Sequence, residues 1–257
     1  MNEIPAVLTC DVGNSRLRIA RICGDDASPV QALPTAELSS LPEALASLWG
    51  EDPTPKSLAA TSVNPAGLEA LQAAAQQALN LDVAVVGRDL PLPIETDLPH
   101  PDAIGTDRLC CAAAAYDRLG TGCVIADFGT AVTIDCVNDE GVLLGGAILP
   151  GLRMSAECLS ASTAQLPAVE PIEPDWVFGK DTHQAIVGGL VRGARGALRE
   201  LVEAYATELG RWPIVIATGG DAELVCGQGG ASELVQAVVP ELSLRGVAMA
   251  YYRSLLR

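Results

Sequence analysis

Residues 6–15 read AVLTCDVGNS, and residues 122–131 read GCVIADFGTA. In both stretches a short apolar run ends in Asp-x-Gly, and a second apolar run follows, at 17–22 and at 132–137. Two apolar runs joined by a Gly turn predict a β-hairpin. Asp and Gly are common in turns of every kind, so one copy alone would mean little. Two copies at equivalent points of the chain indicate an internal duplication.

A similar series of elements follows each hairpin. In the first half, the hydrophobic pattern predicts strands at 30–33, 58–63 and 83–86 and helices at 42–49, 66–79 and 107–119. In the second half, it predicts strands at 142–149, 214–217 and 234–238 and helices at 153–160, 184–209 and 245–255. We read each half as β-β-β-α-β-α-β-α, an alternation that needs helices on both faces of a sheet. The sequence therefore predicts an α/β protein with two domains, 1–120 and 121–257, and a cleft between them.

The composition narrows the class of protein. The chain has 257 residues, of which 32 are acidic and 16 basic, giving a net charge of −16. A hydrophobic content of 49% is too high for a disordered chain. Binding to nucleic acid or to an anionic membrane needs clustered Lys and Arg, which this sequence lacks. We expect a folded protein whose partners are small molecules.

The cysteines and the N-terminal segment indicate the compartment. The eight cysteines form no CxxC pair, and two histidines are too few for most zinc sites. Residues 1–5 lack the basic segment of a signal peptide. No apolar run reaches the roughly 18–20 residues that span a bilayer. The sequence therefore predicts a cytoplasmic protein with reduced thiols.

Both Asp-x-Gly turns are candidate phosphate sites. Tight turns of small residues bring backbone N–H groups together, and such groups can cradle phosphate oxygens. Asn14, Ser15 and Thr130 add neutral donors, and Arg16 and Arg18, two apart on a strand, should point to one face. No GxxxxGK[ST] motif occurs, which excludes a P-loop. A purely structural turn remains the alternative at each position.

A second candidate is Gly105-Thr106-Asp107-Arg108, at the start of the helix predicted from 107. Asp at a helix start is usually a cap. Arg108 is less usual there, because cations are favoured at the C-terminal ends of helices. A carboxylate beside a guanidinium would suit an acceptor hydroxyl next to an anion. Cap and site both remain possible from these residues alone.

Three further glycine-containing segments read as turns or as places of close backbone approach: 145–151 (GGAILPG), 178–182 (FGKDT) and 217–221 (ATGGD). The last ends a predicted strand, and ligands of open α/β sheets bind beyond the carboxyl ends of strands. We therefore expect this turn to contact a nucleotide, with ordinary turn chemistry as the alternative for each segment.

Together these motifs resemble those of the type III pantothenate kinases, within the superfamily of acetate and sugar kinases, Hsp70 and actin. The matching segments are 11–15, 105–108, 127–131, 145–146 with 150–151, 163–167, 180–182 and 218–220. The resemblance implies two ribonuclease H-like domains. It also implies ATP-dependent phosphorylation of pantothenate on its primary hydroxyl, which gives 4'-phosphopantothenate in the first step of coenzyme A biosynthesis.

The resemblance also implies roles for individual residues in binding ATP and metals. The first ATP-phosphate loop would consist of Asp11, Val12, Gly13, Asn14, Ser15, Arg16, Leu17 and Arg18. In this loop Asp11 would lie near Mg²⁺, and Thr130 would make a further ATP contact. Asp127 would bind a monovalent cation, K⁺ or NH₄⁺.

For the substrate, the resemblance implies that Asp107 is the general base. Gly105, Thr106 and Arg108 would bind pantothenate together with Thr182. Members of the family are homodimers, so a homodimer is the implied assembly.

One position departs from the family pattern. The family usually has a Tyr seven residues before the Gly of its Gly-x-Asp-Arg segment, where it packs on pantothenate, and this chain has Leu98 there. Two alternatives follow: a catalytically silent homologue that binds a nucleotide or a partner, and a kinase for another small hydroxylated acid. Retention of Asp11, Asp107, Asp127 and Thr130 favours an active kinase.

Overall fold

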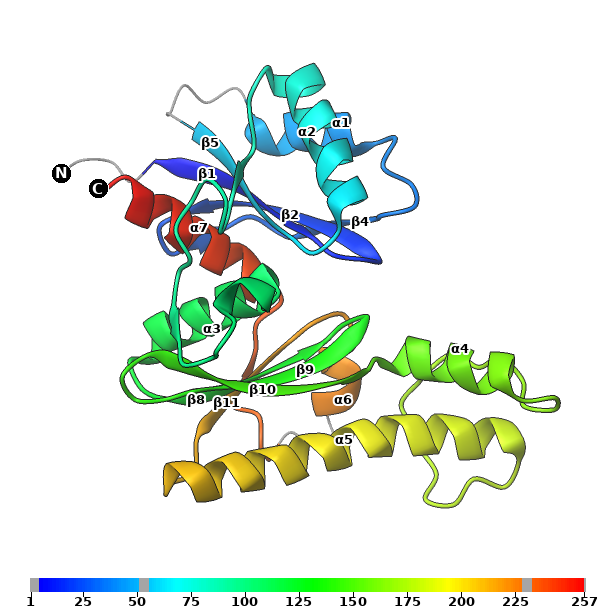
Figure 1. The fold of residues 1–257 in the computed structure, drawn as a ribbon. Helices are drawn as coiled ribbons and strands as arrows, with labels where there is room; N and C mark the ends of the chain where they lie inside the picture. The colour runs from blue at the N-terminus through cyan, green and yellow to red at the C-terminus, as the bar shows by residue number, and fades with distance from the viewer. Residues whose placement is uncertain (1–4, 51–55, 228–232, 257) are drawn as a thin grey trace. The chain divides into compact units, whose positions relative to one another are not determined.

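The computed structural model describes residues 5–50, 56–227 and 233–256. Its contacts divide the chain into two compact units (Figure 1). The first unit comprises residues up to Arg118, Gly141–Leu143 and the segment from Glu241 onward. The second comprises Leu119–Glu140 and Leu144–Pro240, so it is inserted between two parts of the first.

The first unit is built on a mixed sheet in the order β3-β2-β1-β5-β6, with β4 also paired to β2. Its elements are β1 (Ala6–Val12), β2 (Arg16–Cys23), β3 (Asp26–Ala27), β4 (Gln31–Pro34), α1 (Leu41–Trp49), β5 (Lys56–Ser62), α2 (Pro65–Leu79), β6 (Ala84–Val85), β7 (Glu95–Thr96), a 3-10 turn (Pro101–Ala103), α3 (Thr106–Leu119) and α7 (Leu242–Ser254). The hairpin of β1 and β2 is antiparallel, and β5 and β6 continue the sheet in parallel.

The second unit repeats this arrangement in a sheet ordered β12-β11-β8-β9-β10. Its elements are β8 (Cys123–Phe128), β9 (Ala131–Val137), β10 (Val142–Pro150), α4 (Leu152–Ser162), α5 (Thr182–Leu209), β11 (Ile214–Thr218), α6 (Ala222–Cys226) and β12 (Ala237–Val238). The hairpin of β8 and β9 is antiparallel, and β11 pairs with β8 in parallel, as β5 does with β1. The predicted duplicated α/β fold of ribonuclease H-like type is therefore confirmed.

Strand β1 is buried along its whole length because helices cover both faces of its sheet. Leu8 and Cys10 face a cluster that includes Leu45 of α1 and Leu71 of α2. Val7 faces the opposite cluster, to which α7 contributes. Figure 1 shows α1 and α2 on one side of β1 and β2, and α7 on the other. A strand enclosed in this way reads as a continuous apolar run, as residues 6–12 do.

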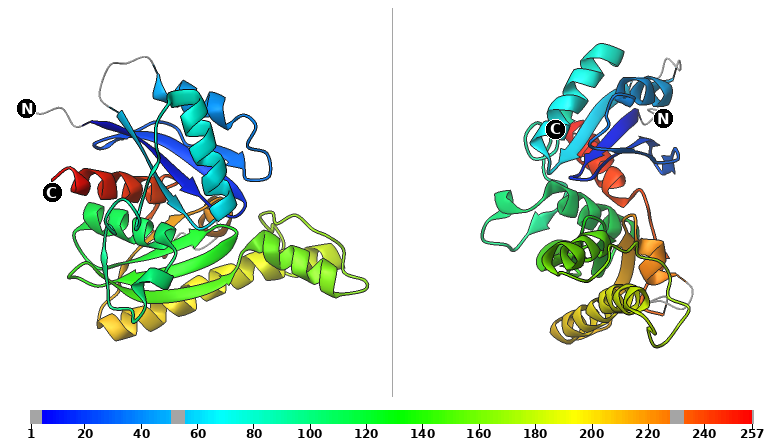
Figure 2. Two further views of the ribbon diagram at one scale, coloured as in Figure 1. Left: turned by 45° about the horizontal axis from the view of Figure 1, so that its top comes forward. Right: turned by 90° about the vertical axis from the view of Figure 1, so that its right-hand side faces the viewer.

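In the second unit one long helix covers a face of the sheet. Helix α5 has 28 residues, about 42 Å at 1.5 Å per residue. Its Val191 and Leu198 pack in one cluster with Val124 and Phe128 of β8. Figure 2 shows that α5 runs past the sheet to α4, against which it packs.

Two expectations for the second half are wrong in detail. The predicted order β-β-β-α-β-α-β-α fits the first half except for the two-residue strands β3 and β7, which were not predicted. In the second half α5 follows α4 with no strand between them in the described residues. The predicted strand at 234–238 is reduced to Ala237–Val238, and the five-residue α6 was not predicted. Short elements carry too few residues for periodicity to identify them.

The last helix belongs to a different unit from the one its position in the chain suggests. The sequence placed residues 245–255 in a domain 121–257, whereas α7 packs in the first unit. Leu244 and Val247 of α7 lie in one cluster with Val7 and Ile22. Periodicity identified an apolar helix face, but it does not specify which of two similar sheets that face covers.

Among the described residues, no helix is both long enough and apolar enough to span a bilayer.

Candidate active site

The first candidate turn carries a buried ion pair at its base. Asp11 and Arg18 are opposite one another in the β1–β2 register, so their side chains share one face of the sheet. Arg18 Nη2 donates to Asp11 Oδ2 at 2.5 Å. The Asp11 side chain is 6% exposed and that of Arg18 20% exposed. A buried carboxylate is stable only when it is paired, and the guanidinium opposite provides the pairing.

The turn itself is fixed by residues from two other segments. Gly13 N–H donates to the Arg16 carbonyl oxygen at 3.0 Å, which closes the hairpin. The amide of Asn64, at the start of α2, donates to the Gly13 carbonyl oxygen at 3.3 Å. Thr35 N–H donates to the Ser15 carbonyl oxygen at 3.0 Å. Asn14, Ser15 and Arg16 are exposed at its tip. The turn is therefore held from outside and presents its polar tip to solvent, as a phosphate-binding loop would.

Asp107 lies in the first turn of α3, which begins at Thr106. Its Oδ1 accepts a hydrogen bond from the Arg108 N–H at 2.8 Å. Burial raises the pKa of the Asp107 carboxyl, and the negative charge of Asp11 raises this pKa further. The Arg108 N–H and the guanidinium groups of Arg108 and Arg18 lower it, but by less. The structure therefore brings Asp11, Arg18 and Asp107 within electrostatic range of one another in the first unit.

The residues around Asp107 are closely packed. Thr106 Oγ1 and Thr61 Oγ1 are 2.6 Å apart, which joins the start of α3 to β5. A Cβ added to Gly105 would collide with Asp107 Oδ1. A side chain at 105 would therefore force the Asp107 carboxylate to move. Burial also raises the pKa of the Cys110 thiol well above its usual value, so this cysteine stays neutral in the core beneath the site.

The second candidate turn centres on Asp127 at the end of β8. Gly129 N–H donates to the Ala131 carbonyl oxygen at 3.1 Å, the counterpart of the bond that closes the first hairpin. Asp127 is directly opposite Thr218 in the parallel register of β8 and β11. A Cβ on Gly219, which has a φ of 97°, would collide with Asp127 Oδ1. The predicted 217–221 segment thus lies against this carboxylate.

Thr218 is fully buried, and its hydroxyl has no hydrogen-bond partner among the residues that the structure describes. A buried polar atom without a partner is rare and often marks the place of a bound ion or water. Its oxygen and the Asp127 carboxylate are of the type that hard cations bind. These two residues fit a cation site, and the sequence had singled out Thr218 only as part of a Gly turn.

Three other predicted site residues, Thr130, Thr182 and Leu98, lie at exposed or half-buried positions. Thr130 is exposed, and a Cβ on Gly151 would collide with its carbonyl oxygen. Thr182 is the exposed first residue of α5. Leu98 is half-buried, and its N–H donates to Thr96 Oγ1 at 3.2 Å.

Sequence reasoning missed one residue of the Asp11 cluster. Ser243 of α7 is fully buried, and its hydroxyl donates to Asp11 Oδ2 at 2.7 Å. Arg18 Nη2 also donates to Ser243 Oγ at 3.1 Å. The signal in the sequence is weak, because a single Ser in an apolar helical segment is unremarkable. It is recognisable only once α7 is assigned to the first sheet.

Divalent metal binding at Asp11 is consistent with its surroundings. Oδ2 is held by Arg18 and Ser243, whereas Oδ1 accepts no hydrogen bond from the described residues. Mg²⁺ is commonly held by one or two carboxylates, with water and substrate phosphates completing its shell. Within the described ranges no three His, Cys, Asp or Glu side chains converge as a metal cage. Asp11 fits the first type of site.

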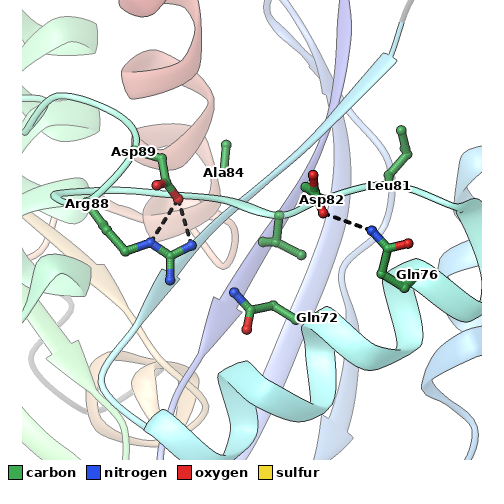
Figure 3. Close-up of a pocket in the computed structure, with 8 residues that line it drawn as sticks. Gln72, Gln76, Leu81, Asp82, Ala84, Arg88 and Asp89 are labelled. Atoms are coloured by element: carbon green, nitrogen blue, oxygen red, sulfur yellow. Dashed lines mark hydrogen bonds and ion pairs between the residues drawn. The ribbon is translucent and has the colours of Figure 1, made fainter.

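A cavity of about 600 Å³ lies elsewhere in the first unit, between α2 and the segment 81–89 (Figure 3). Arg88 points into it but is paired with Asp89, at 2.7 Å between Nη2 and Oδ2. Gln76 Nε2 donates to Asp82 Oδ1 at 2.8 Å on the other side. The paired charges leave no net positive charge for a phosphate, and none of the predicted site residues lines this cavity.

Comparisons with known proteins identify the family to which the chain is similar. The profile of the type III pantothenate kinase family matches residues 7–204. A type III pantothenate kinase of Akkermansia muciniphila is 41% identical over 162 residues, 63% of this chain and 66% of that protein. One of Bacillus cytotoxicus is 33% identical over 199 residues, 77% of this chain and 75% of that protein. The chain thus matches about two thirds of the first relative's length and three quarters of the second's.

Among solved structures, a Campylobacter jejuni protein titled a conserved Baf family transcriptional activator superposes with a TM-score of 0.60 at 20% identity. The superposition covers 97% of this chain and 100% of that one, and at this identity it shows the shared fold alone. The family match extends over both hairpins and includes Asp11, Asp107 and Asp127, and it ends before Thr218 and Ser243. The chain belongs to the type III pantothenate kinase family.

Proposed function

We propose that this protein transfers the γ-phosphoryl group of ATP to the primary hydroxyl of pantothenate, forming 4'-phosphopantothenate for coenzyme A biosynthesis. Family membership supports the substrate pair. The observation that carries the chemistry is the juxtaposition of Asp107, whose pKa is raised by burial and by Asp11, with the Asp11–Arg18 pair. Phosphoryl transfer needs positioning and charge neutralisation, and this cluster offers both.

In this proposal Asp107 accepts the proton of the pantothenate hydroxyl and orients that oxygen toward the γ-phosphorus. A raised pKa makes the carboxylate a stronger base, which suits removal of a proton from an alcohol. The Arg108 N–H holds Oδ1, so the other oxygen faces the substrate. Gly105 and Thr106 position this segment, and Arg108 binds the substrate anion.

Residues 11–18 bind the ATP phosphates in the same proposal, with Thr130 as a further contact. Asp11 would hold Mg²⁺, which would supply neutralisation of the phosphate charge during transfer. Arg18 offsets the negative charge of Asp11 at the same point. This local neutralisation allows a chain of net charge −16 to bind two anionic substrates.

Asp127 is the proposed ligand for a monovalent cation, K⁺ or NH₄⁺. Support comes from the buried hydroxyl of Thr218, which lacks a hydrogen-bond partner in the described part of the chain and belongs to the residue opposite Asp127 in the strand register. Thr182 and the segment containing Leu98 complete the proposed pantothenate contacts. Leu98 offers apolar contact where an aromatic ring would offer a flat face, so we expect weaker pantothenate binding.

The proposed assembly is a homodimer. Large apolar side chains are exposed on the second unit at Ile148, Met154, Ile172, Val177 and Phe178. Val177 is 76% exposed and Phe178 73% exposed, and apolar surface of this kind commonly marks a protein interface. Light scattering on the protein and on a Val177→Ser/Phe178→Ser double variant tests this assembly, since a monomeric wild type would refute it.

The proposed compartment is the cytoplasm. All eight cysteines are free thiols, six of them buried, which agrees with a reducing environment.

The function is tested by coupling ADP release to NADH oxidation, with and without pantothenate, in Mg²⁺ and K⁺. Pantothenate-dependent ADP release together with a product of the mass of 4'-phosphopantothenate would establish the activity. Turnover with another hydroxylated acid but not with pantothenate would indicate a different kinase specificity. Nucleotide binding without turnover on any acid would identify a silent homologue.

A further inference from the structure

Helix α7 contacts the carboxylate that the proposed function assigns to Mg²⁺-ATP. Ser243, the second residue of α7, is fully buried. Its hydroxyl donates to Asp11 Oδ2 at 2.7 Å and accepts from Arg18 Nη2 at 3.1 Å. Arg18 Nη2 also reaches Asp11 Oδ2, so the three side chains form a closed triangle. The hydroxyl is therefore the one neutral member of a buried charged cluster.

The same helix is packed against the helix that carries Asp107. A Cβ on Gly246 would collide with the backbone of Cys110, so α7 and α3 touch backbone to backbone at this point. Gly246 follows Ser243 by three residues, and Cys110 follows Asp107 by three residues. This contact between the two helices thus comes about one turn after Ser243 and after Asp107.

We propose that Ser243 is a positioning residue for phosphoryl transfer: its hydroxyl fixes the Asp11 carboxylate, and α7 sets that carboxylate at a defined separation from Asp107. The inference rests on the proposed function, because it assigns Asp11 to Mg²⁺-ATP and Asp107 to the acceptor hydroxyl. Ser243 touches neither substrate in this proposal and acts through Asp11.

The physical reason is the orientation of a carboxylate with two different partners. An ion pair alone lets the carboxylate rotate about its Cβ–Cγ bond while it stays close to the guanidinium. A second donor on Oδ2 fixes that oxygen and directs Oδ1, which accepts no hydrogen bond from the described residues, toward the ligand. Outer residues that hydrogen-bond a metal-binding carboxylate typically change metal affinity or activity about 10–100-fold when they are removed.

The test compares Ser243→Ala with Ser243→Thr, which keeps the hydroxyl. Binding of a non-hydrolysable ATP analogue is measured by calorimetry over a range of Mg²⁺ concentrations, without pantothenate. We expect Ser243→Ala to raise the Mg²⁺ concentration needed for half-maximal nucleotide binding by about 10–100-fold. Ser243→Thr should restore most of this loss. In the kinase assay, Ser243→Ala should raise the Mg²⁺ requirement far more than the KM for pantothenate.

Ser254→Ala is the matched control, because Ser254 lies in the last turn of the same helix and its hydroxyl donates to the Tyr251 carbonyl oxygen at 2.6 Å. It should leave the Mg²⁺ requirement unchanged. An unchanged Mg²⁺ requirement in folded Ser243→Ala would overturn the positioning role, as would a loss that Ser243→Thr does not restore. The binding measurement is independent of the acceptor, so a wild type that binds Mg²⁺-nucleotide but never phosphorylates pantothenate would refute the proposed function and leave standing the role of Ser243 in holding Asp11 for Mg²⁺-nucleotide.

Discussion

Replacing Asp107 with Asn separates catalysis from stability at one position. The Asn side chain has the shape of Asp, and its Oδ1 can still accept the 2.8 Å hydrogen bond from the Arg108 N–H. The substitution therefore removes the charge and leaves the local packing in place. If Asp107 is the general base, kcat should fall by about 10²–10⁴-fold, which corresponds to about 2.7–5.5 kcal/mol of lost transition-state stabilisation.

The same substitution should increase stability at neutral pH. Burial and the charge of Asp11 raise the pKa of Asp107 in the folded protein, so ionised Asp107 opposes folding. Above the folded-state pKa, the ionised carboxylate lowers the unfolding free energy by its full amount. Asn has no charge and therefore avoids this loss. Below the unfolded-state pKa of about 3.9 both states hold the proton, and the advantage of Asn disappears. The gain in unfolding free energy should therefore be largest at pH 7–8, a range well above that reference pKa, and shrink as the pH is lowered.

The assays are steady-state kinetics at saturating ATP and pantothenate, and urea unfolding at several pH values. Asp117→Asn is the matched control, because Asp117 lies on the same helix and is exposed. It should change neither kcat nor the urea midpoint. Near-full turnover in Asp107→Asn would refute the base assignment and leave Asp107 as a structural residue of the helix start. A lower urea midpoint at pH 8 would refute the electrostatic argument.

Three further outcomes are expected. Asp127→Asn should weaken the dependence of kcat on K⁺ much more than it lowers the melting temperature, whereas full wild-type activity with a bulky ammonium salt as the sole monovalent cation would contradict the cation site. Leu98→Tyr should lower the KM for pantothenate with little change in kcat, and an unchanged KM would mean that other residues form that wall of the pocket. Gly246→Ala should destabilise the protein by at least about 1–3 kcal/mol in urea unfolding, because its Cβ meets the rigid Cys110 backbone.

The duplicated hairpins were predictable because their signal is local. An apolar run indicates each strand, and Asp-x-Gly indicates each turn. The hairpins predicted within 6–23 and 122–137 therefore agree with the observed strands to within about a residue or two. The position of Asp107 at the start of α3 was predictable for the same reason, since Gly105 to Arg108 are adjacent in the chain. These features depend on neighbours in sequence, which periodicity and turn chemistry report directly.

The contribution of α7 was not predictable in this way. Ser243 is 232 residues from Asp11, and nothing near either residue signals their contact. The same holds for Thr218, whose relation to Asp127 comes from the register of two separate strands. Both residues depend on which elements pair in space. Sequence patterns from one chain identify elements better than they identify partners.

The separation between Asp11 and Ser243 has a consequence for how the protein is made. At synthesis rates of about 5–20 residues per second, roughly 12–46 seconds pass between the emergence of these two residues from the ribosome. During that time α1 and α2 are already available to cover one face of strand β1. Val7 and Ile22 on the other face still lack their contacts with α7. The whole second unit is synthesised within this interval and can fold first. In a nascent chain, Val7 and Ile22 on this face of the sheet therefore lack their α7 partners until residues 242–254 have been made.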